Sequence, residues 1–231
     1  MIGGVAPEVT ATMNCAECGS ETIRTLVLTG GPGAGKTTVA ARLAQRYPQS
    51  VVVVPEAATQ IYRQLGVRWR ELDAAARREF QRRVLELQLQ QEELFRRANP
   101  RALLLLDRGT VDGAAYWPDG PESFFAHFGT TLHRELARYD AVIWLESTAA
   151  GRAYADQRTN PFRQEDAAAA VALAAALARL WQAHGRFERV GLYQTIDAKV
   201  AAVETVLRRW GACLGPPAAP ADAPADQAPG R

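Results

Sequence analysis

An eight-residue, glycine-rich loop follows a short apolar run and indicates the fold class of the chain. The loop reads Gly30-Gly31-Pro32-Gly33-Ala34-Gly35-Lys36-Thr37, and Thr38 comes directly after it. It fits G-x-x-x-x-G-K-[ST], in which glycines let the backbone bend so that successive N–H groups point at phosphate oxygens. The run Arg24–Thr29 predicts a buried strand before the loop, and a helix is expected from Lys36 to about Tyr47 after it. The motif therefore lies between a predicted strand and a predicted helix, as a phosphate-binding loop of this kind does.

Each part of this loop has a predicted role in binding a nucleoside triphosphate. The backbone of residues 30–38 and the positive end of the following helix are expected to hold phosphate oxygens. Lys36 is expected to reach the β- and γ-phosphates and so to act in catalysis, while Thr37 offers its hydroxyl to Mg²⁺. A Gly-rich turn without a ligand is the alternative. The sequence thus predicts ATP and Mg²⁺ as cofactors.

Composition and charge exclude several classes of protein. The chain has 48% hydrophobic and 23% charged residues, as a globular domain does, so a disordered or fibrous chain is excluded. Its 27 basic and 25 acidic side chains are too balanced to hold nucleic acid or an anionic membrane by charge alone. No run approaches the roughly 18 apolar residues of a membrane span, and no signal peptide is evident. We expect a cytoplasmic protein that has neither a nucleic-acid partner nor a membrane span.

Apolar runs alternate with helical patterns along the rest of the chain. Further strands are expected at Val51–Val54, Ala102–Leu106, Ala141–Leu145 and Val190–Ile196, and further helices at Leu72–Ala98, Ser123–Arg138, Ala167–His184 and Ala198–Trp210. Strands that are apolar throughout and alternate with helices form a parallel sheet covered on both faces. The predicted fold class is α/β, a three-layer P-loop NTPase fold with a five-stranded parallel sheet.

Among P-loop proteins, the sequence favours a small kinase. It contains no Asn-Lys-x-Asp-type guanine-binding motif and no Leu-Ser-Gly-Gly-like transporter signature. A long segment, residues 146–189, separates the fourth and fifth predicted strands and carries Arg152, Arg158 and Arg163, which could close over phosphates. This layout is typical of nucleoside and nucleotide kinases.

Three parts of the chain are expected to differ in order. Residues 1–20 are predicted to be a flexible extension, residues 21–214 a P-loop kinase-like domain with a lid at 146–189, and residues 215–231 a disordered Pro- and Ala-rich tail. Cys15 and Cys18 form a C-x-x-C pair without a second pair of ligands nearby, so a zinc or thiol role is the less favoured alternative. Met1 and Met13 both remain possible starts, and the oligomeric state is not predicted.

Polar residues that directly follow the apolar runs are candidates for the site, because ligands of such sheets bind beyond the carboxyl ends of the strands. Asp107 is expected to hold Mg²⁺ together with Thr37, with turn capping as the alternative. Arg108 is expected to face phosphate or substrate rather than make a surface ion pair. Glu56 is expected to accept the proton of an acceptor hydroxyl, and a role at the N-terminus of the next helix is the competing hypothesis.

Two further groups of residues are assigned to the acceptor and the lid. Asp112 and Tyr116 are assigned to substrate binding, because the aromatic pair Tyr116 and Trp117 beside a carboxylate could hold a ring and a ribose hydroxyl. Aromatic residues at this spacing more often belong to the core, which is the competing interpretation. Arg158 and Arg163 are expected to bridge phosphoryl oxygens in the transition state, with a solvated loop as the alternative.

Four groups of residues together resemble a known family. They are Thr29–Thr38, Val54-Pro55-Glu56-Ala57-Ala58, Leu106-Asp107-Arg108-Gly109 with Asp112 and Ala115-Tyr116, and Asn160-Pro161-Phe162-Arg163. Between about Thr25 and Trp210 the chain is similar to the small P-loop ATPase or kinase-like AAA domains. That family is related to the ribosylnicotinamide kinase domain of bacterial regulators of NAD metabolism.

The resemblance implies ATP and Mg²⁺ binding through Lys36, Thr37 and Asp107, and phosphoryl transfer to a small hydroxyl acceptor with Glu56 on the acceptor side. Members of the family that sense nucleotides or lipid head groups imply an alternative. We therefore carry two hypotheses, a kinase acting on a small, nucleoside-like molecule and a nucleotide-gated ATPase or binding module.

Overall fold

The computed structural model describes residues 23–147 and 167–218. The predicted extension with Cys15 and Cys18, lid residues 148–166 and most of the tail lie outside the described residues, so these assignments stay predictions. The described elements are, in order, β1 (Thr25–Thr29), α1 (Lys36–Arg46), β2 (Val51–Val54), α2 (Ala57–Leu65), the 3₁₀ turn η1 (Trp69–Glu71), α3 (Ala74–Ala98), β3 (Leu103–Asp107), α4 (Asp112–Ala115), α5 (Pro121–His127), α6 (Leu132–Leu136), β4 (Ala141–Leu145), α7 (Ala167–Trp181), β5 (Phe187–Val190) and α8 (Ile196–Arg209).

The five strands form one parallel sheet in the order β2-β3-β1-β4-β5. In the middle of the sheet, Val27 pairs with Leu106 on one side and with Val142 on the other. Leu28 is in register with Asp107, so the loops that follow β1 and β3 emerge side by side. The predicted α/β class and the five-stranded parallel sheet are confirmed.

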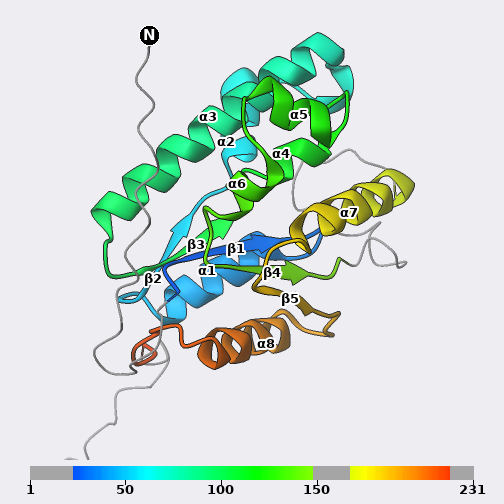
Figure 1. Ribbon diagram of the computed structural model, residues 1–231. Helices are drawn as coiled ribbons and strands as arrows, with labels where there is room; N and C mark the ends of the chain where they lie inside the picture. Colours follow the sequence, from blue (N-terminus) through cyan, green and yellow to red (C-terminus); the bar gives the residue numbers. More distant parts are fainter. Residues whose placement is uncertain (1–22, 148–166, 219–231) are drawn as a thin grey trace, which may run out of the picture.

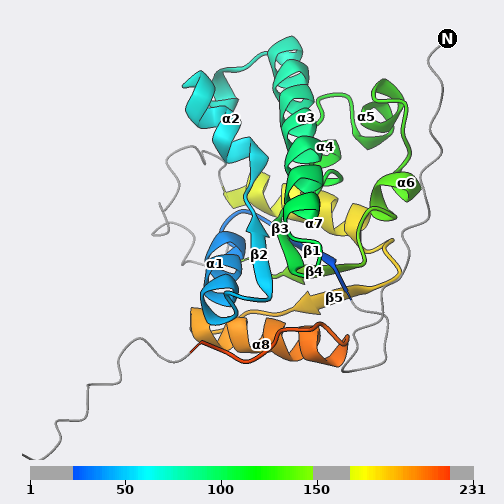
Figure 2. The ribbon, with the colours of Figure 1, turned by 90° about the vertical axis from the view of Figure 1, so that its left-hand side faces the viewer.

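Side chains that alternate along the strands divide the core into two layers. Leu26 and Leu28 pack with α1 and α8 on one face of the sheet, while Val27 and Trp181 belong to the core of the other face. Figures 1 and 2 show α1 and α8 on one side of the sheet and α3 and α7 on the other. This is the predicted three-layer arrangement.

The fifth strand lies earlier in the chain than predicted. The prediction placed it at Val190–Ile196, whereas β5 covers Phe187–Val190 and pairs with β4 from Val142↔Phe187 to Leu145↔Val190. An edge strand has only one neighbouring strand and needs no continuous apolar run. The charged Glu188 and Arg189 interrupt the apolar pattern of β5, so this pattern did not predict a strand. The residues that suggested the strand form a loop in which Leu192 is 63% exposed.

The helix predicted over Ser123–Arg138 is two short helices, α5 and α6. Gly129 between them has a left-handed φ of 62°, which an α-helix does not tolerate. Thr131 then caps α6 by accepting a hydrogen bond from the Arg134 N–H. By contrast, the long helix predicted at Leu72–Ala98 is confirmed as α3. Its N-cap is Asp73, whose side chain accepts a hydrogen bond from the Ala76 N–H.

None of the helices in the two described ranges is both long and apolar enough to cross a membrane. α3 has 25 residues but is rich in Arg, Gln and Glu, whereas the apolar α7 has 15.

We predict that Leu105→Ala lowers the free energy of unfolding by about 2–5 kcal/mol, because Leu105 is fully buried in the central sheet and truncation leaves a cavity. The measurement is urea denaturation followed by circular dichroism. Leu94→Ala is the matched control, because Leu94 on α3 is 64% exposed. Equal losses in the two variants would contradict this account of the core.

Candidate functional site

The phosphate loop is pressed against the ends of other elements, and glycine makes this possible. Gly30 has φ 143°, and a Cβ atom there would lie 2.3 Å from the Leu145 carbonyl oxygen at the end of β4. A Cβ on Gly31 would lie 2.8 Å from the Cβ of Ala174 in α7. Gly35, the residue before α1, has φ 82°. Because these positions exclude side chains or need a left-handed backbone, the loop can lie close to the sheet and α7.

Lys36 begins α1 and folds back over this loop. Its side chain is 2% exposed, and Nζ donates to the carbonyl oxygens of Gly30 and Gly31 at 2.9 and 3.0 Å. The ammonium therefore lies within the loop, beside the N-terminus of α1, where backbone N–H groups and the helix dipole favour an anion.

Thr37 and Asp107 meet at the carboxyl ends of β1 and β3. The Thr37 hydroxyl donates to Oδ2 of Asp107 at 2.5 Å. Asp107 is 2% exposed, and its Oδ1 is buried without a hydrogen-bond partner among the described residues. Burial, and then the nearby carboxylate of Glu56, raise the pKa of Asp107, while Lys36 and Arg108 offset part of this effect.

This pair fits a divalent cation. A carboxylate oxygen that is buried without a donor is costly unless something positive satisfies it. Mg²⁺ prefers oxygen ligands, usually one or two carboxylates together with water and phosphate oxygens. The orphaned Oδ1 of Asp107 and the hydroxyl of Thr37 supply such a set, next to a loop suited to phosphate.

Arg108, directly after β3, joins two carboxylates. Its Nε donates to Oε1 of Glu56 at 2.5 Å, and its NH1 donates to Oδ1 of Asp112 at 2.7 Å. The other oxygen of Glu56 accepts the Thr59 hydroxyl at 2.7 Å. Arg108 is thus a buried ion-pair centre, 7% exposed, and the expected alternative of a surface ion pair is wrong.

The guanidinium of Arg108 stays protonated although the side chain is buried. Burial opposes the guanidinium charge, but Tyr116 and the carboxylates of Glu56 and Asp112 outweigh it and hold the pKa of Arg108 well above its usual range. Its backbone has φ 78°, the one positive value outside glycine in the described residues. Such a conformation is unfavourable for a side chain of this size, and the two ion pairs and the buried turn around it hold it in place.

Asp112 is fixed from three sides. Besides Arg108, it accepts hydrogen bonds from the Thr29 hydroxyl at 3.2 Å and from the indole N–H of Trp181 at 2.8 Å. Trp181 lies in the helix predicted over Ala167–His184 and had no predicted role in the site, because nothing in sequence shows that an indole on α7 reaches the turn after β3. Its N–H makes Asp112 a rigid acceptor.

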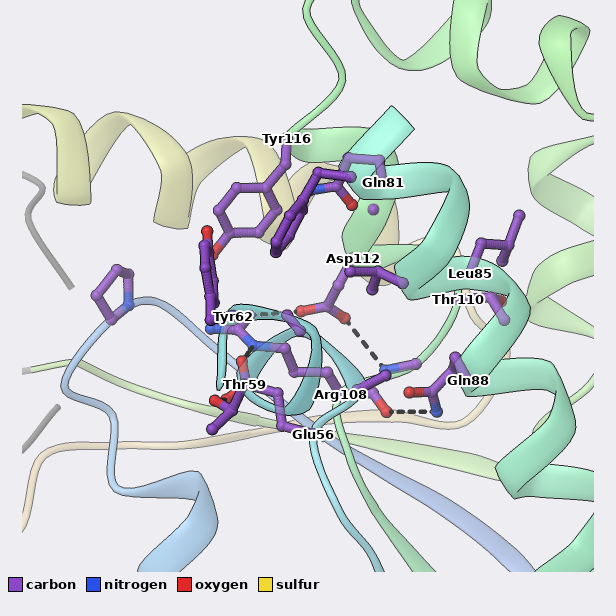
Figure 3. Close-up of a pocket in the computed structure, with 17 residues that line it drawn as sticks. Glu56, Thr59, Tyr62, Gln81, Leu85, Gln88, Arg108, Thr110, Asp112 and Tyr116 are labelled. Carbon is purple, nitrogen blue, oxygen red and sulfur yellow. Dashed lines mark hydrogen bonds and ion pairs between the residues drawn. The ribbon is translucent and has the colours of Figure 1, made fainter. Parts of the chain in front are cut away.

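A pocket opens beside this ion-pair centre, as Figure 3 shows. Its empty space, including solvent at the mouth, is about 800 Å³. Glu56, Arg108 and Asp112 lie together on one side, and α3 contributes Gln81, which is 4% exposed. The residues that line it are Pro32, Glu56, Ala57, Ala58, Thr59, Tyr62, Phe80, Gln81, Val84, Leu85, Gln88, Arg108, Gly109, Thr110, Asp112, Gly113 and Tyr116. Since Pro32 belongs to the phosphate loop, the pocket and the loop adjoin.

Aromatic rings form part of the pocket wall. The rings of Tyr62 and Phe80 have centroids 4.4 Å apart, and the guanidinium of Arg108 lies 5.8 Å from the centroid of Tyr116. Trp117 instead packs edge-on against Phe124 in the core, so of the expected aromatic pair only Tyr116 lines the pocket.

The structure therefore brings most of the predicted site residues together. The phosphate loop, Asp107, Arg108, Glu56, Asp112 and Tyr116 all lie at one end of the sheet. Arg158 and Arg163 lie outside the described residues, and their roles stay predictions. Tyr62, Gln81 and Trp181 were missed; the helical spacing of α3 could have put Gln81 beside Phe80 and Val84, but not in a pocket.

The chain belongs to an AAA-domain family, whose model matches residues 25–191. This confirms the P-loop domain expected from the phosphate loop. No curated protein sequence matches the chain significantly.

Solved structures show the same fold at low sequence identity. Deoxyadenosine kinase from M. mycoides with bound dATP matches with a TM-score of 0.57 and 14% identity, over 80% of this chain and 99% of that one. The same kinase with the products dCMP and dCDP bound matches with a TM-score of 0.56 and 12% identity, over the same shares. The NadR protein in complex with NAD and AMP-PNP matches with a TM-score of 0.56 and 16% identity, over 83% of this chain but 50% of that one. The fold is therefore nucleoside-kinase-like.

We predict that Arg108→Met lowers the free energy of unfolding by about 3–5 kcal/mol, because it leaves the buried Asp112 and the partly buried Glu56 without their common cation. The measurement is chemical denaturation at pH 7. Arg97→Met is the control and should change stability little, since Arg97 pairs with Glu93 on an exposed face of α3. An Arg108→Met protein as stable as the control would show that the ion-pair centre is not a structural constraint.

Proposed function

We propose that this chain is a kinase that transfers the γ-phosphoryl group of ATP to a hydroxyl of a small, nucleoside-like acceptor. The observation that carries the proposal is the position of the pocket, which lies directly beside the phosphate loop and has the ion-pair centre of Arg108 on one side. Pro32 of the loop and Glu56 and Arg108 of the ion-pair centre line the same space. An enzyme that moves a phosphoryl group needs two adjoining sites of this kind, one for polyphosphate and one for an acceptor.

On the donor side, backbone N–H groups within residues 30–38, Pro32 excepted, hold the phosphates, and Lys36 supplies a positive charge. In the described structure the Lys36 ammonium bonds to loop carbonyls, so it lies already at the loop when phosphate arrives. Phosphoryl transfer asks the protein mainly for positioning and for neutralisation of charge on the transferred oxygens. We assign Arg158 and Arg163 to the same task from the lid.

Thr37 and Asp107 would hold Mg²⁺, which when bound offsets the charge of the phosphates. The support is the buried, unpartnered Oδ1 of Asp107 beside the Thr37 hydroxyl. Ionised Asp107 is required for this role, so burial, which raises its pKa, disfavours the ligand form until a cation binds.

On the acceptor side, Glu56 takes the hydroxyl proton as the acceptor oxygen forms its bond to the γ-phosphorus and the bond to the β–γ bridging oxygen breaks. The products are a phosphomonoester and ADP, with the proton on Glu56. Arg108 bonds to one oxygen of Glu56 and Thr59 to the other, which fixes the carboxylate towards the pocket. Glu56 also orients the hydroxyl for attack, because phosphoryl transfer depends strongly on the positioning of the nucleophile.

The pocket wall supports a ring-bearing acceptor. The rings of Tyr62, Phe80 and Tyr116 offer flat apolar surface, and the Gln81 amide offers a donor and an acceptor at the same wall. Asp112, held by Trp181, offers carboxylate oxygen to a sugar hydroxyl. The likeness to a deoxyadenosine kinase agrees with this assignment in fold alone.

The first test is release of ADP from MgATP in the presence of a panel of nucleosides. We expect one or more nucleosides to accelerate ADP release, and Lys36→Ala to weaken MgATP binding by about 10- to 100-fold, because neighbouring amides cannot replace its charge. Calorimetry measures the binding, and Arg42→Ala, an exposed cation of α1, serves as control. Hydrolysis that no acceptor accelerates would contradict the kinase and favour the nucleotide-gated module.

The second test concerns the base. Glu56→Gln should lower turnover by about 10²- to 10⁴-fold, the usual contribution of general-base catalysis, while MgATP affinity stays within twofold. Arg108 remains paired with Asp112 in this variant, so the pocket keeps its cation. Glu86→Gln, which removes a carboxylate from the exposed face of α3, should leave turnover unchanged. Normal turnover of Glu56→Gln would remove Glu56 from catalysis.

A further inference from the structure

The chain contains two lysines, Lys36 and Lys199, and both bond to the phosphate loop. Lys199 belongs to α8, which Figure 2 shows beside α1 on one face of the sheet. It is 6% exposed, and its Nζ donates to the Ala34 carbonyl at 3.1 Å and to the Glu146 carbonyl at 3.0 Å. A single ammonium thus ties the middle of the phosphate loop to the chain just after β4.

Burying the Lys199 ammonium costs free energy, and a neutral hydrogen-bond donor could hold two carbonyls at a lower cost. No carboxylate in the described residues lies within ion-pair distance of Lys199, and the hydrogen-bond acceptors that its Nζ has there are two backbone carbonyls. Burial lowers the pKa of Lys199, and the more distant charge of Glu146 offsets part of this shift. A buried cation without an anion is favourable mainly when an anion arrives nearby, and the phosphate loop is where one is expected.

The geometry of one peptide unit connects Lys199 to the bound phosphate. In a trans peptide, the carbonyl of one residue and the N–H of the next point in opposite directions. A donor that holds the Ala34 carbonyl on the α8 side therefore turns the Gly35 N–H away from α8, towards the inside of the loop. Gly35 has a left-handed φ of 82° and lies close to α8, since a Cβ built on it would be 3.3 Å from the side chain of Ile196.

Neutral contacts brace the rest of the loop. The Ser147 hydroxyl donates to the Pro32 carbonyl, and Gly31 packs against Ala174 of α7. These contacts fix the first half of the loop from the β4 and α7 side. The second half, where the amides precede α1, has Lys199 as its charged brace.

We propose that Lys199 is a positioning residue for nucleotide binding, which orients the Ala34–Gly35 peptide so that its N–H faces the bound phosphates. The inference rests on the proposed binding of ATP at this loop and adds a residue on α8, remote in sequence, to the phosphate site. Lys199 acts through the loop backbone and its charge.

The test measures calorimetric binding of MgATP and of magnesium tripolyphosphate to the full chain. Lys199→Met keeps the apolar stem but not the ammonium, and we expect about tenfold weaker binding of both ligands. Lys199→Arg should recover part of the loss, because a guanidinium can also donate to two carbonyls. Arg209→Met is the matched control, since it removes an exposed cation from the same helix, and it should bind as the unaltered chain does.

A second measurement uses the unaltered chain, in which Lys199 keeps its ammonium, and follows the lysine side-chain signals by NMR. In protein labelled at lysine, two side-chain signals are expected by NMR, and the spectrum of Lys199→Arg assigns them. Magnesium tripolyphosphate should shift both the Lys36 and the Lys199 signals. This measurement also decides the case in which Lys199→Met does not fold.

The outcomes separate this inference from the proposed function. Unaltered affinity of a folded Lys199→Met, or a Lys199 signal that stays still while that of Lys36 moves, overturns the role of Lys199 and leaves ATP binding intact. Equal weakening in Arg209→Met also overturns it, because the effect would then be general to α8. If neither lysine signal moves and the unaltered chain does not bind MgATP, the proposed function fails as well.

Discussion

The close approach of Gly30 to the carbonyl of Leu145 is the constraint on which the site depends. Only a residue without a Cβ fits there, and this contact presses the phosphate loop against the end of the sheet. The loop then lies beside the end of β3, because β1 and β3 are neighbours and Leu28 is in register with Asp107. Thr37 and Asp107 meet for that reason. The position of the proposed donor site thus follows from strand order and from one glycine.

The proposed acceptor site depends on a second constraint, the buried guanidinium of Arg108. It holds carboxylates from two different elements, Glu56 after β2 and Asp112 in α4, and Trp181 of α7 fixes the second of these. A buried cation with two anions leaves a network of net negative charge, which suits a neutral hydroxyl compound better than an anionic one. The two constraints share the end of β3, where Asp107 and Arg108 are adjacent, so the phosphate loop and the pocket lie side by side.

Much of this arrangement could be predicted from sequence, because it follows from local patterns. The glycine pattern before Lys36 and the apolar runs predicted the fold, and the rule that ligands bind beyond strand ends selected Glu56, Asp107 and Arg108. Contacts between remote elements could not be predicted. Nothing local shows that Trp181 reaches Asp112 or that Lys199 reaches the loop. The edge strand β5 was misplaced because its pattern is the least apolar in the sheet.

We propose above that the loop at residues 30–37 binds the phosphates of ATP beside a pocket for the acceptor. The most direct measurement is a crystal structure with magnesium and a non-hydrolysable ATP analogue. The account predicts triphosphate oxygens within hydrogen-bond distance of the loop amides and Lys36, magnesium beside Thr37 and Asp107, and the γ-phosphate facing Glu56. An analogue bound elsewhere, or with its γ-phosphate turned away from the pocket, would contradict it.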